Sequence, residues 1–108
     1  MNKILCLVKE PAKPIKFASV DNDLHALQDL VGGFIEVHTL NSHIVAICDE
    51  EGRLKNKTYC CTSGGFHFVG TVIWCGFKDD EFTDIDIRPE DYWLIPQSDH
   101  YNGKEWTV

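Results

Sequence analysis

Cysteine and histidine are the residues of this chain that could bind a metal ion or act as a nucleophile with its base. Each occurs five times, as Cys6, Cys48, Cys60, Cys61 and Cys75 and as His25, His38, His43, His67 and His100. None stands in the C-x-x-C or H-x-x-x-H spacing that is typical of zinc sites. His38 and His43 could face each other across a hairpin, although solvated imidazoles are the simpler interpretation. The sequence therefore predicts no metal site and no cofactor.

The thiols are expected to pack inside the protein. Cys6, Cys48 and Cys75 lie in apolar runs, where a free cysteine behaves as a small hydrophobic residue. The adjacent Cys60 and Cys61 could form a soft-metal or redox pair. Neighbouring side chains point apart in an extended chain, however, which argues against that interpretation.

Catalysis by a nucleophile would need a base within hydrogen-bond reach. His67 is close enough in sequence to serve Cys61 or Ser63, yet the pattern offers no third group that would orient it. We predict no catalytic residue and a protein that is not an enzyme.

The net charge of −7 comes almost wholly from the last third of the chain. Residues 1–77 carry eight acids and seven bases, while residues 78–108 carry nine acids and three bases. An exposed acidic face could dock against a basic groove, with aromatic side chains as anchors. The predicted binding residues are Asp79, Asp80, Glu81, Asp84, Asp86, Glu90, Asp91, Tyr92 and Trp93. Solvated turn acids are the simpler alternative, and no EF-hand spacing supports calcium binding.

A second hypothesis is a small-ligand site. Ser63, Gly64 and Gly65 could form a backbone nest for an anion, with Arg53 and nearby lysines supplying positive charge. A plain turn is the simpler interpretation of these residues. Spare aromatic side chains, Trp93 and Trp106 among them, could stack on a base or anchor a protein interface, or could pack over a sheet face.

The elements that must position these residues are mostly strands. Apolar runs and alternation predict strands over residues 4–8, 15–20, 34–40 and 43–48, the last two joined by a tight turn at Asn41 and Ser42. One helix is predicted over residues 22–31. Asp21 or Asn22 would cap it, residues 24, 27, 30 and 31 would form its apolar stripe, and Gly32 with Gly33 would end it.

The second half of the chain is less regular. Residues 53–65 resist assignment, and residues 66–77 form the longest β-favouring run, with Gly70 marking a bulge or a close approach. Residues 82–87 read as a half-exposed strand, and Pro89 opens a helical turn. We therefore predict an α+β fold in a single domain of residues 1–108, with a core over 3–95 and a polar tail over 96–108. One main helix would cover one face of an antiparallel sheet. The other face would fold on itself or pair with another chain, such as a second copy of this protein.

Composition limits the partners. A chain of 108 residues with 44% apolar residues is one folded domain rather than a disordered tail. Seventeen acids against ten bases argue against direct contact with nucleic acid or an anionic membrane. No secretory signal or membrane-spanning run is recognisable, and an odd number of cysteines without framework spacing fits a reducing compartment. The expected location is the cytoplasm.

Four segments together carry a family resemblance. They are ILCLVKEPAKP near the start, LHALQDLVGGFIEV, DEEGRLKNK and FVGTVIWCGFKDDEFTDI. In these the chain, over residues 3–87, resembles domain-of-unknown-function family number 3846. It departs from the family's pattern after Asn56, where Cys60 and Cys61 replace a longer polar excursion.

The resemblance implies an origin more than an activity, since the family is found mostly in phages, prophages and other mobile elements. By analogy, such a protein inhibits a host defence system, such as CRISPR or restriction. It would do so as a DNA mimic, as a plug on a defence protein or as a sponge for a signalling nucleotide. We therefore expect a non-enzymatic phage accessory protein that binds a host protein through its acidic segment. Sequestration of a nucleotide signal, or a structural or regulatory role, are the alternatives.

Overall fold

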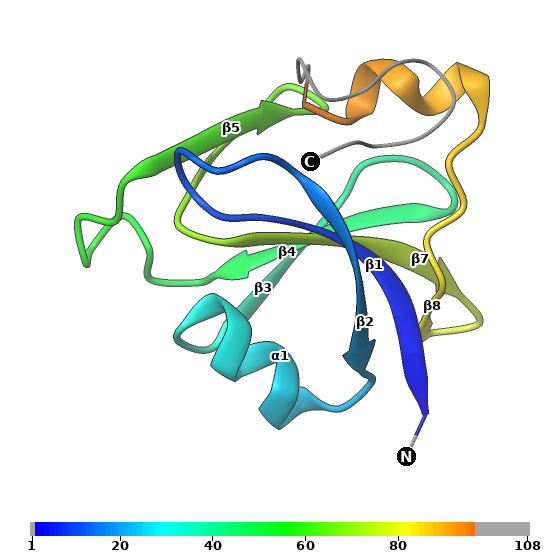
Figure 1. The fold of residues 1–108 in the computed structure, drawn as a ribbon, viewed down its shortest axis with the longest axis horizontal. Helices are drawn as coiled ribbons and strands as arrows, with labels where there is room; N and C mark the ends of the chain where they lie inside the picture. The colour runs from blue at the N-terminus through cyan, green and yellow to red at the C-terminus, as the bar shows by residue number, and fades with distance from the viewer. Residues whose placement is uncertain (1, 97–108) are drawn as a thin grey trace.

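A computed structural model describes residues 2–96 (Figure 1). These residues form eight β-strands, one α-helix and one 3-10 helix, in the order β1 (Lys3–Lys9), β2 (Lys16–Asp21), α1 (Leu24–Val31), β3 (Ile35–Thr39), β4 (Ile44–Asp49), β5 (Tyr59–Ser63), β6 (Phe66–Val69), β7 (Val72–Lys78), β8 (Glu81–Thr83) and η1 (Pro89–Leu94). The tail beyond Pro96, with the predicted aromatic Trp106, lies outside the described residues.

The strands form one large antiparallel sheet and one hairpin. The large sheet has the order β2-β1-β7-β4-β3, and β8 pairs with β7 beyond the end of β1. Helix α1 covers one face of this sheet, while the β5–β6 hairpin and η1 lie over the opposite face (Figure 1). The predicted antiparallel sheet with one main helix is confirmed. Its second face is covered by the chain's own later segments.

Two apolar clusters fill the space on either side of the sheet. Leu27 and Val31 of α1 pack with Ile73 and its buried neighbours on one side. On the other side Trp74 packs with Phe68 of β6 and Leu94 of η1. Because alternate residues of a strand point to opposite faces, β7 supplies both clusters from consecutive residues.

Helix α1 is shorter than predicted. Asp23 is its N-cap, accepting from the amide of Ala26 at 2.8 Å, whereas Asp21 and Asn22 stand before it. Gly32 ends the helix in the left-handed conformation, at φ 83°, as the sequence predicted. Leu24 remains 57% exposed, so the predicted apolar stripe is only partly buried.

Strands β5 to β8 differ from the predicted strands in number and in length. The unassigned residues 53–65 contain β5, and the run 66–77 is two strands that separate at Gly70, where φ is 73°. A Cβ on Gly70 would stand 2.8 Å from the side chain of Lys57, which confirms the predicted close approach. The strand predicted over 82–87 ends at Thr83, since Asp84 turns its carboxylate to the amide of Leu5.

All five cysteines are free and buried, as packing in the core predicts. Cys60 and Cys61 both join the cluster around Trp74. The expectation that they point apart is wrong, because the register of the β5–β6 hairpin shifts between Tyr59 and Cys61. Such a bulge adds a residue to one strand and turns neighbouring side chains to the same side.

The hairpin of β3 and β4 is confirmed, but its turn is longer than predicted. Thr39 pairs with Val45, and the Asn41 side chain accepts from the amides of His43 and Ile44 at 2.9 and 2.8 Å. That side chain stabilises a wider loop than the predicted pair of turn residues. His38 lies opposite Ala46, so it does not face His43. Within residues 2–96, no helix has the length and apolar character needed to cross a membrane.

Candidate functional site

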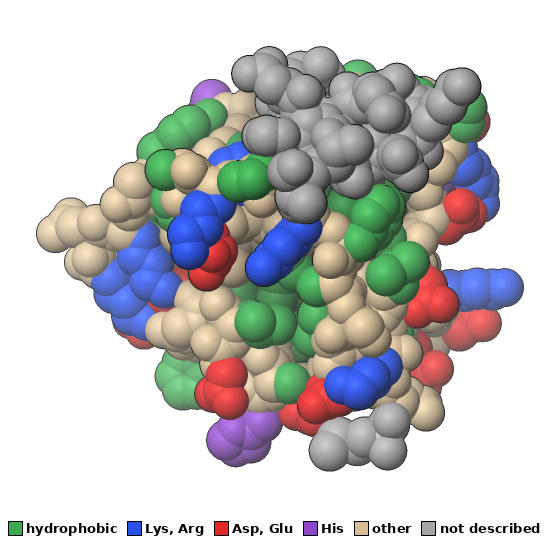
Figure 2. All heavy atoms as spheres, viewed as in Figure 1, with side chains coloured by type: hydrophobic (Ala, Val, Ile, Leu, Met, Phe, Trp, Pro, Cys, Tyr) green, Lys and Arg blue, Asp and Glu red, His purple; other side chains and the backbone are tan. Residues whose placement is uncertain are grey.

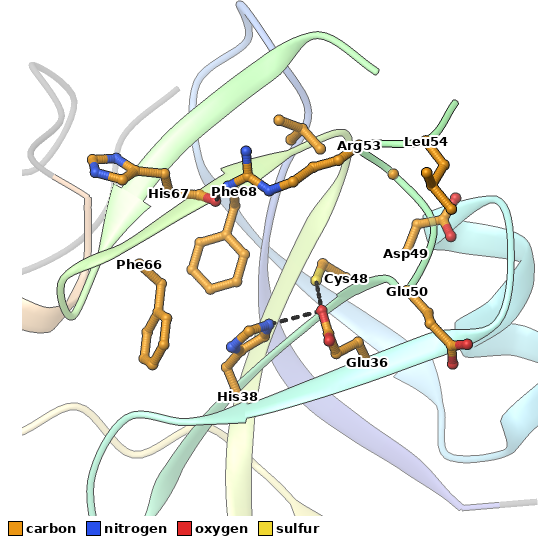
Figure 3. Close-up of a pocket in the computed structure, with 12 residues that line it drawn as sticks. Glu36, His38, Cys48, Asp49, Glu50, Arg53, Leu54, Phe66, His67 and Phe68 are labelled. Carbon is orange, nitrogen blue, oxygen red and sulfur yellow. Dashed lines mark hydrogen bonds and ion pairs between the residues drawn. The ribbon is translucent and has the colours of Figure 1, made fainter. Parts of the chain in front are cut away.

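A cavity of about 310 Å³ opens between the β3–β4 hairpin, the turn that follows β4, and β6 (Figure 3). Its lining residues come from three separate parts of the sequence. They are Glu36, His38, Cys48, Asp49, Glu50, Gly52, Arg53, Leu54, Phe66, His67, Phe68 and Val69. Ligand sites of proteins begin at about 300 Å³, so this cavity has the size for a small ligand.

Three rings form one wall of the cavity. The imidazole of His38 lies 4.8 Å from the ring of Phe66 and 5.2 Å from that of Phe68, centroid to centroid. Within this wall Phe68 is buried, whereas Phe66 is 41% exposed. Aromatic groups at these separations attract each other, and an exposed ring face can accept a further planar group.

Arg53 belongs to the turn after β4 and lines the cavity from that side. Its guanidinium donates to the carbonyl of His67 at 2.7 Å, and Figure 3 shows the side chain extended above Phe68. A guanidinium has five N–H donors in a rigid plane. The fixed end therefore leaves further donors for a ligand with oxygen acceptors.

Glu36, His38 and Cys48 gather at one side of the cavity and point toward one another (Figure 3). The Glu36 carboxylate lies 3.0 Å from Nε2 of His38 and 3.8 Å from Sγ of Cys48. Burial, together with the nearby Glu36 carboxylate, raises the pKa of the Cys48 thiol to about 12. The thiol is therefore protonated at neutral pH, and carboxylate, imidazole and thiol form one hydrogen-bonded group.

Asp49 follows Cys48 in β4 and points away from this group. Its carboxylate is bound by the ammonium groups of Lys55 at 2.8 Å and Lys57 at 2.7 Å. Burial acts to raise the pKa of Asp49, but the two lysines and the Glu51 amide outweigh it and hold the pKa at about 2. We call Asp49, Lys55 and Lys57 the Asp49 network.

The Asp49 network also closes the end of α1. Lys55 donates to the carbonyl of Gly32 at 3.1 Å, and Lys57 to that of Val31 at 2.6 Å. Cations at the carboxyl end of a helix satisfy its free carbonyls and its dipole. Gly33 leaves the space, since a Cβ there would stand 2.6 Å from Nζ of Lys55 and 2.7 Å from a carboxylate oxygen of Asp49. This contact brings together two of the segments that carry the family resemblance.

The predicted acidic residues differ in their exposure and in their contacts. Asp79, Asp80 and Glu81 are exposed at the turn from β7 to β8, and Glu90 is exposed in η1. Figure 2 shows acidic and basic side chains interspersed along the edge formed by β8 and the chain leading to η1. Trp93, at 68% exposure, belongs to η1 at the far end of this edge (Figure 1).

Several predicted binding residues have contacts within the protein. Asp86 pairs with Arg88 at 3.4 Å, and the carboxylate of Asp84 accepts from Leu5 at 2.7 Å. Asp91 is only 2% exposed, so its assignment to an exposed face is wrong. Tyr92 is half-buried.

Asp91 instead joins η1 to the β3–β4 loop. It accepts from the side chains of His43 at 2.7 Å and Asn41 at 3.0 Å, and from the amide of Arg88 at 2.9 Å. Burial opposes ionisation, but these donors prevail and lower the pKa of Asp91. Ser42 approaches the other nitrogen of His43 at 3.3 Å. The arrangement has a serine, a histidine and an aspartate in contact, and its evident effect is to fix the loop against η1.

The predicted anion nest is a hairpin turn. Gly64 and Gly65 have positive φ and connect β5 to β6. Ser63 is buried, where it donates to the carbonyl of Leu94 and accepts from the Trp74 indole at 2.9 Å. His67 contacts Thr62 at 2.8 Å. Neither Ser63 nor Cys61 is thus paired with His67.

A wider hollow of about 430 Å³ lies between β2 and α1. Its lining contains aliphatic, small and charged side chains but no aromatic ring, histidine or cysteine. The cavity beside β3 is therefore the better candidate, because it combines rings with converging polar groups.

The residues of this cavity were not identified from the sequence as a group. The available signal was the spacing of Glu36 and His38, which puts both side chains on one face of a strand. Comparison with known proteins gives a family and no activity. No curated protein and no solved structure matches the chain. The family model described as Domain of unknown function (DUF3846) matches residues 2–93, and the chain belongs to this family.

Proposed function

We propose that this protein acts by binding a small molecule in the cavity between β3, the turn after β4, and β6. One observation carries the proposal. The aromatic wall of His38 and Phe66 and the guanidinium of Arg53 line the same cavity of about 310 Å³. Rings give contact area, and a few polar groups fix the orientation of a ligand. The proposal favours the second of the two hypotheses drawn from the sequence.

The lining indicates the chemistry of the ligand. A planar ring would lie against the exposed face of Phe66, with an oxygen acceptor directed to Arg53. Glu36 and Glu50 also line the cavity, so carboxylates outnumber the guanidinium. The ligand is therefore not a polyanion on its own, and a nucleotide would need a cation with it.

A thermal-shift panel of nucleosides, nucleotides and aromatic metabolites tests the proposal. A ligand at 100 times its Kd stabilises a protein by about 2.7 kcal/mol, which raises the Tm of a domain of this size by about 10 °C. Phe66→Ala should abolish the shift. Phe17→Ala is the matched control, because Phe17 is also a strand phenylalanine and is 43% exposed, against 41% for Phe66.

A second pair of variants tests the contact between the ligand and the Arg53 guanidinium. Arg53→Ala should weaken binding of any hit that carries an oxygen acceptor, whereas Arg88→Ala, at an exposed arginine outside the cavity, should not. If no compound in the panel shifts the Tm, or if both pairs of variants respond alike, the cavity is not the binding site.

Docking to a host protein through the acidic edge is the second candidate. The exposed carboxylates of Asp79, Asp80 and Glu81 at one turn favour it, since clustered charge steers association with a basic groove. A phage or mobile-element origin, a cytoplasmic location and a target among nucleic-acid-binding defence proteins belong to this proposal.

Capture from a bacterial host lysate at low and high salt tests the second candidate. The triple variant Asp79→Asn, Asp80→Asn, Glu81→Gln should lose any partner that binds through the edge. A control should neutralise three acids outside the acidic edge and outside this cavity, Glu10→Gln, Asp29→Asn and Glu51→Gln. A partner that does not bind nucleic acid, or that binds all forms equally, counts against docking by DNA mimicry.

A further inference from the structure

We propose that Glu36, His38 and Cys48 bind one divalent transition-metal ion, with zinc as the preferred ion, and leave a coordination position open to the cavity. The site rests on strand geometry. Glu36 and His38 are two apart in β3, and Cys48 is the direct partner of Glu36 in β4. Residues with these relations share one face of a sheet and have adjacent Cβ atoms. Two strands of the large sheet thus supply all three groups.

The distances suit a single ion. The three donor atoms lie within 4.8 Å of one another, and two of the separations are 3.0 and 3.8 Å. Zinc bonds of about 2.0–2.3 Å in a tetrahedral arrangement put neighbouring ligand atoms about 3.3–3.8 Å apart. The observed separations thus differ from those of a tetrahedral site by about 1 Å or less.

The donor set indicates which ion. Thiolate, imidazole and carboxylate together suit zinc and its neighbours, whereas calcium and magnesium prefer oxygen alone. Three protein ligands with a fourth position free are typical of zinc sites that take a water or a substrate. In Figure 3 the three side chains converge at the cavity, and the imidazole of His38 also lies beside the rings of Phe66 and Phe68.

Charge gives an independent argument. Both the imidazole of His38 and the thiol of Cys48 are directed at the Glu36 carboxylate. When the ion binds, the Cys48 thiol releases its proton to solvent and the imidazole proton resides on Nδ1. A divalent ion with one thiolate and one carboxylate is neutral. Asp49 cannot serve as a fourth ligand without losing Lys55 and Lys57.

The open position would face the ligand of the proposed function. A ligand oxygen or nitrogen could complete the coordination while its ring lies against Phe66. This last step rests on the proposed function, whereas the metal site itself rests only on Glu36, His38 and Cys48.

Cobalt titration of the full, untagged and reduced protein tests the site. One equivalent of Co²⁺ should produce a thiolate-to-cobalt charge-transfer band and visible bands of low coordination number, and Zn²⁺ should displace it. Cys48→Ala should abolish the charge-transfer band. Cys6→Ala is the control, because Cys6 is another buried free thiol of the sheet.

Two variants at less buried positions guard against misfolding of the cysteine variant. Glu36→Gln and His38→Gln should each weaken cobalt binding by more than about 100-fold, since loss of a second-shell partner alone costs 10–100-fold. His67→Gln, at a histidine of the same cavity outside the group, should leave the affinity unchanged.

The outcomes separate the two proposals. A wild-type protein with no saturable cobalt binding, or a band that persists in Cys48→Ala, overturns the metal site. A compound that shifts the Tm of such metal-free protein through Phe66 would still support small-molecule binding. Cobalt binding with no hit in the compound panel supports the metal site and counts against the proposed function.

Discussion

Two carboxylates stand on neighbouring strands at the same end of the sheet, and their surroundings are opposite. Asp49 in β4 is buried and bound by two lysines. Glu36 in β3 has no lysine or arginine within salt-bridge distance among residues 2–96, and its contacts are the imidazole of His38 and the thiol of Cys48. The first group is closed, and two cations compensate its carboxylate. The second group is open, and its carboxylate has no lysine or arginine partner among residues 2–96.

The difference between the two carboxylates indicates which polar group stabilises the fold and which one is available to a ligand. A buried charge is tolerated when cations and hydrogen bonds compensate it, as in the Asp49 network, which also fastens α1 to the turn after β4. A polar group left partly exposed and without a counter-charge adds little to stability and remains available to a ligand. We therefore expect substitution of Asp49 to destabilise the protein strongly and substitution of Glu36 to change its stability little.

Asp49→Ala should have the largest effect. The substitution leaves Lys55 and Lys57 close together with no anion between them. It also removes the carboxylate that holds Lys57 against the Val31 carbonyl at the end of α1. Because the lysines are partly solvated, we expect a loss at the low end of the range for broken buried pairs, about 3 kcal/mol of unfolding free energy. Urea unfolding measures this. Glu51→Ala, at an exposed acid of the same turn, is the control and should change stability by less than about 0.5 kcal/mol.

The pH dependence of the unfolding free energy tests whether the ionised Asp49 carboxylate stabilises the fold. The pKa of Asp49 is lowered from 3.8 to about 2 in the folded protein, so its contribution to stability is fully present above about pH 4. It is lost as the pH falls through about 2, because the unfolded chain then takes up the proton first. The difference in unfolding free energy between wild type and Asp49→Asn should therefore shrink between pH 4 and pH 2. A difference that stays constant over this range would show that the ionised carboxylate is not what stabilises the protein.

Gly33→Ala should cost less, about 1.5 kcal/mol, as overpacking usually does. The new Cβ would meet Nζ of Lys55 and the carboxylate of Asp49, so one of them must move. In the background of Asp49→Ala and Lys55→Ala, the same substitution should cost little. A double-mutant cycle in urea measures this coupling, and equal costs in both backgrounds would mean that Gly33 is required for another reason.

Sequence patterns predicted secondary structure elements and turns, but they predicted neither the Asp49 network nor the group of Glu36, His38 and Cys48. The helix with its Gly32 cap, the β3–β4 hairpin and the turn at η1 follow from local residue preferences, which short-range physics sets. Asp91 shows the limit of reading charge from a contiguous segment. It stands in the most acidic run of the chain, yet its partners Asn41 and His43 are about fifty residues away, and the sequence gives no sign of that contact.

The group of Glu36, His38 and Cys48 was not predicted because the expected register of β3 and β4 is wrong by one residue. The predicted turn of Asn41 and Ser42 would pair Glu36 with Ile47 and direct Cys48 to the opposite face of the sheet. In the structure the wider loop pairs Glu36 with Cys48. A slip of one residue exchanges the two faces of a strand, so the cluster becomes recognisable only after the Asn41 side chain is seen to accept from two loop amides.

The smallest effect on stability is expected for Glu36→Gln, and it gives the most direct test of the comparison. The side chain is exposed, and its loss of charge removes no lysine or arginine contact within residues 2–96. We expect less than about 0.5 kcal/mol of change in the metal-free protein, against about 2 kcal/mol for Asp49→Asn, which removes charge-assisted hydrogen bonds. Added Zn²⁺ should then raise the Tm of wild type and Asp49→Asn but not of Glu36→Gln. If instead Glu36→Gln destabilises the metal-free protein as much as Asp49→Asn does, both carboxylates are structural and the distinction between the two groups fails.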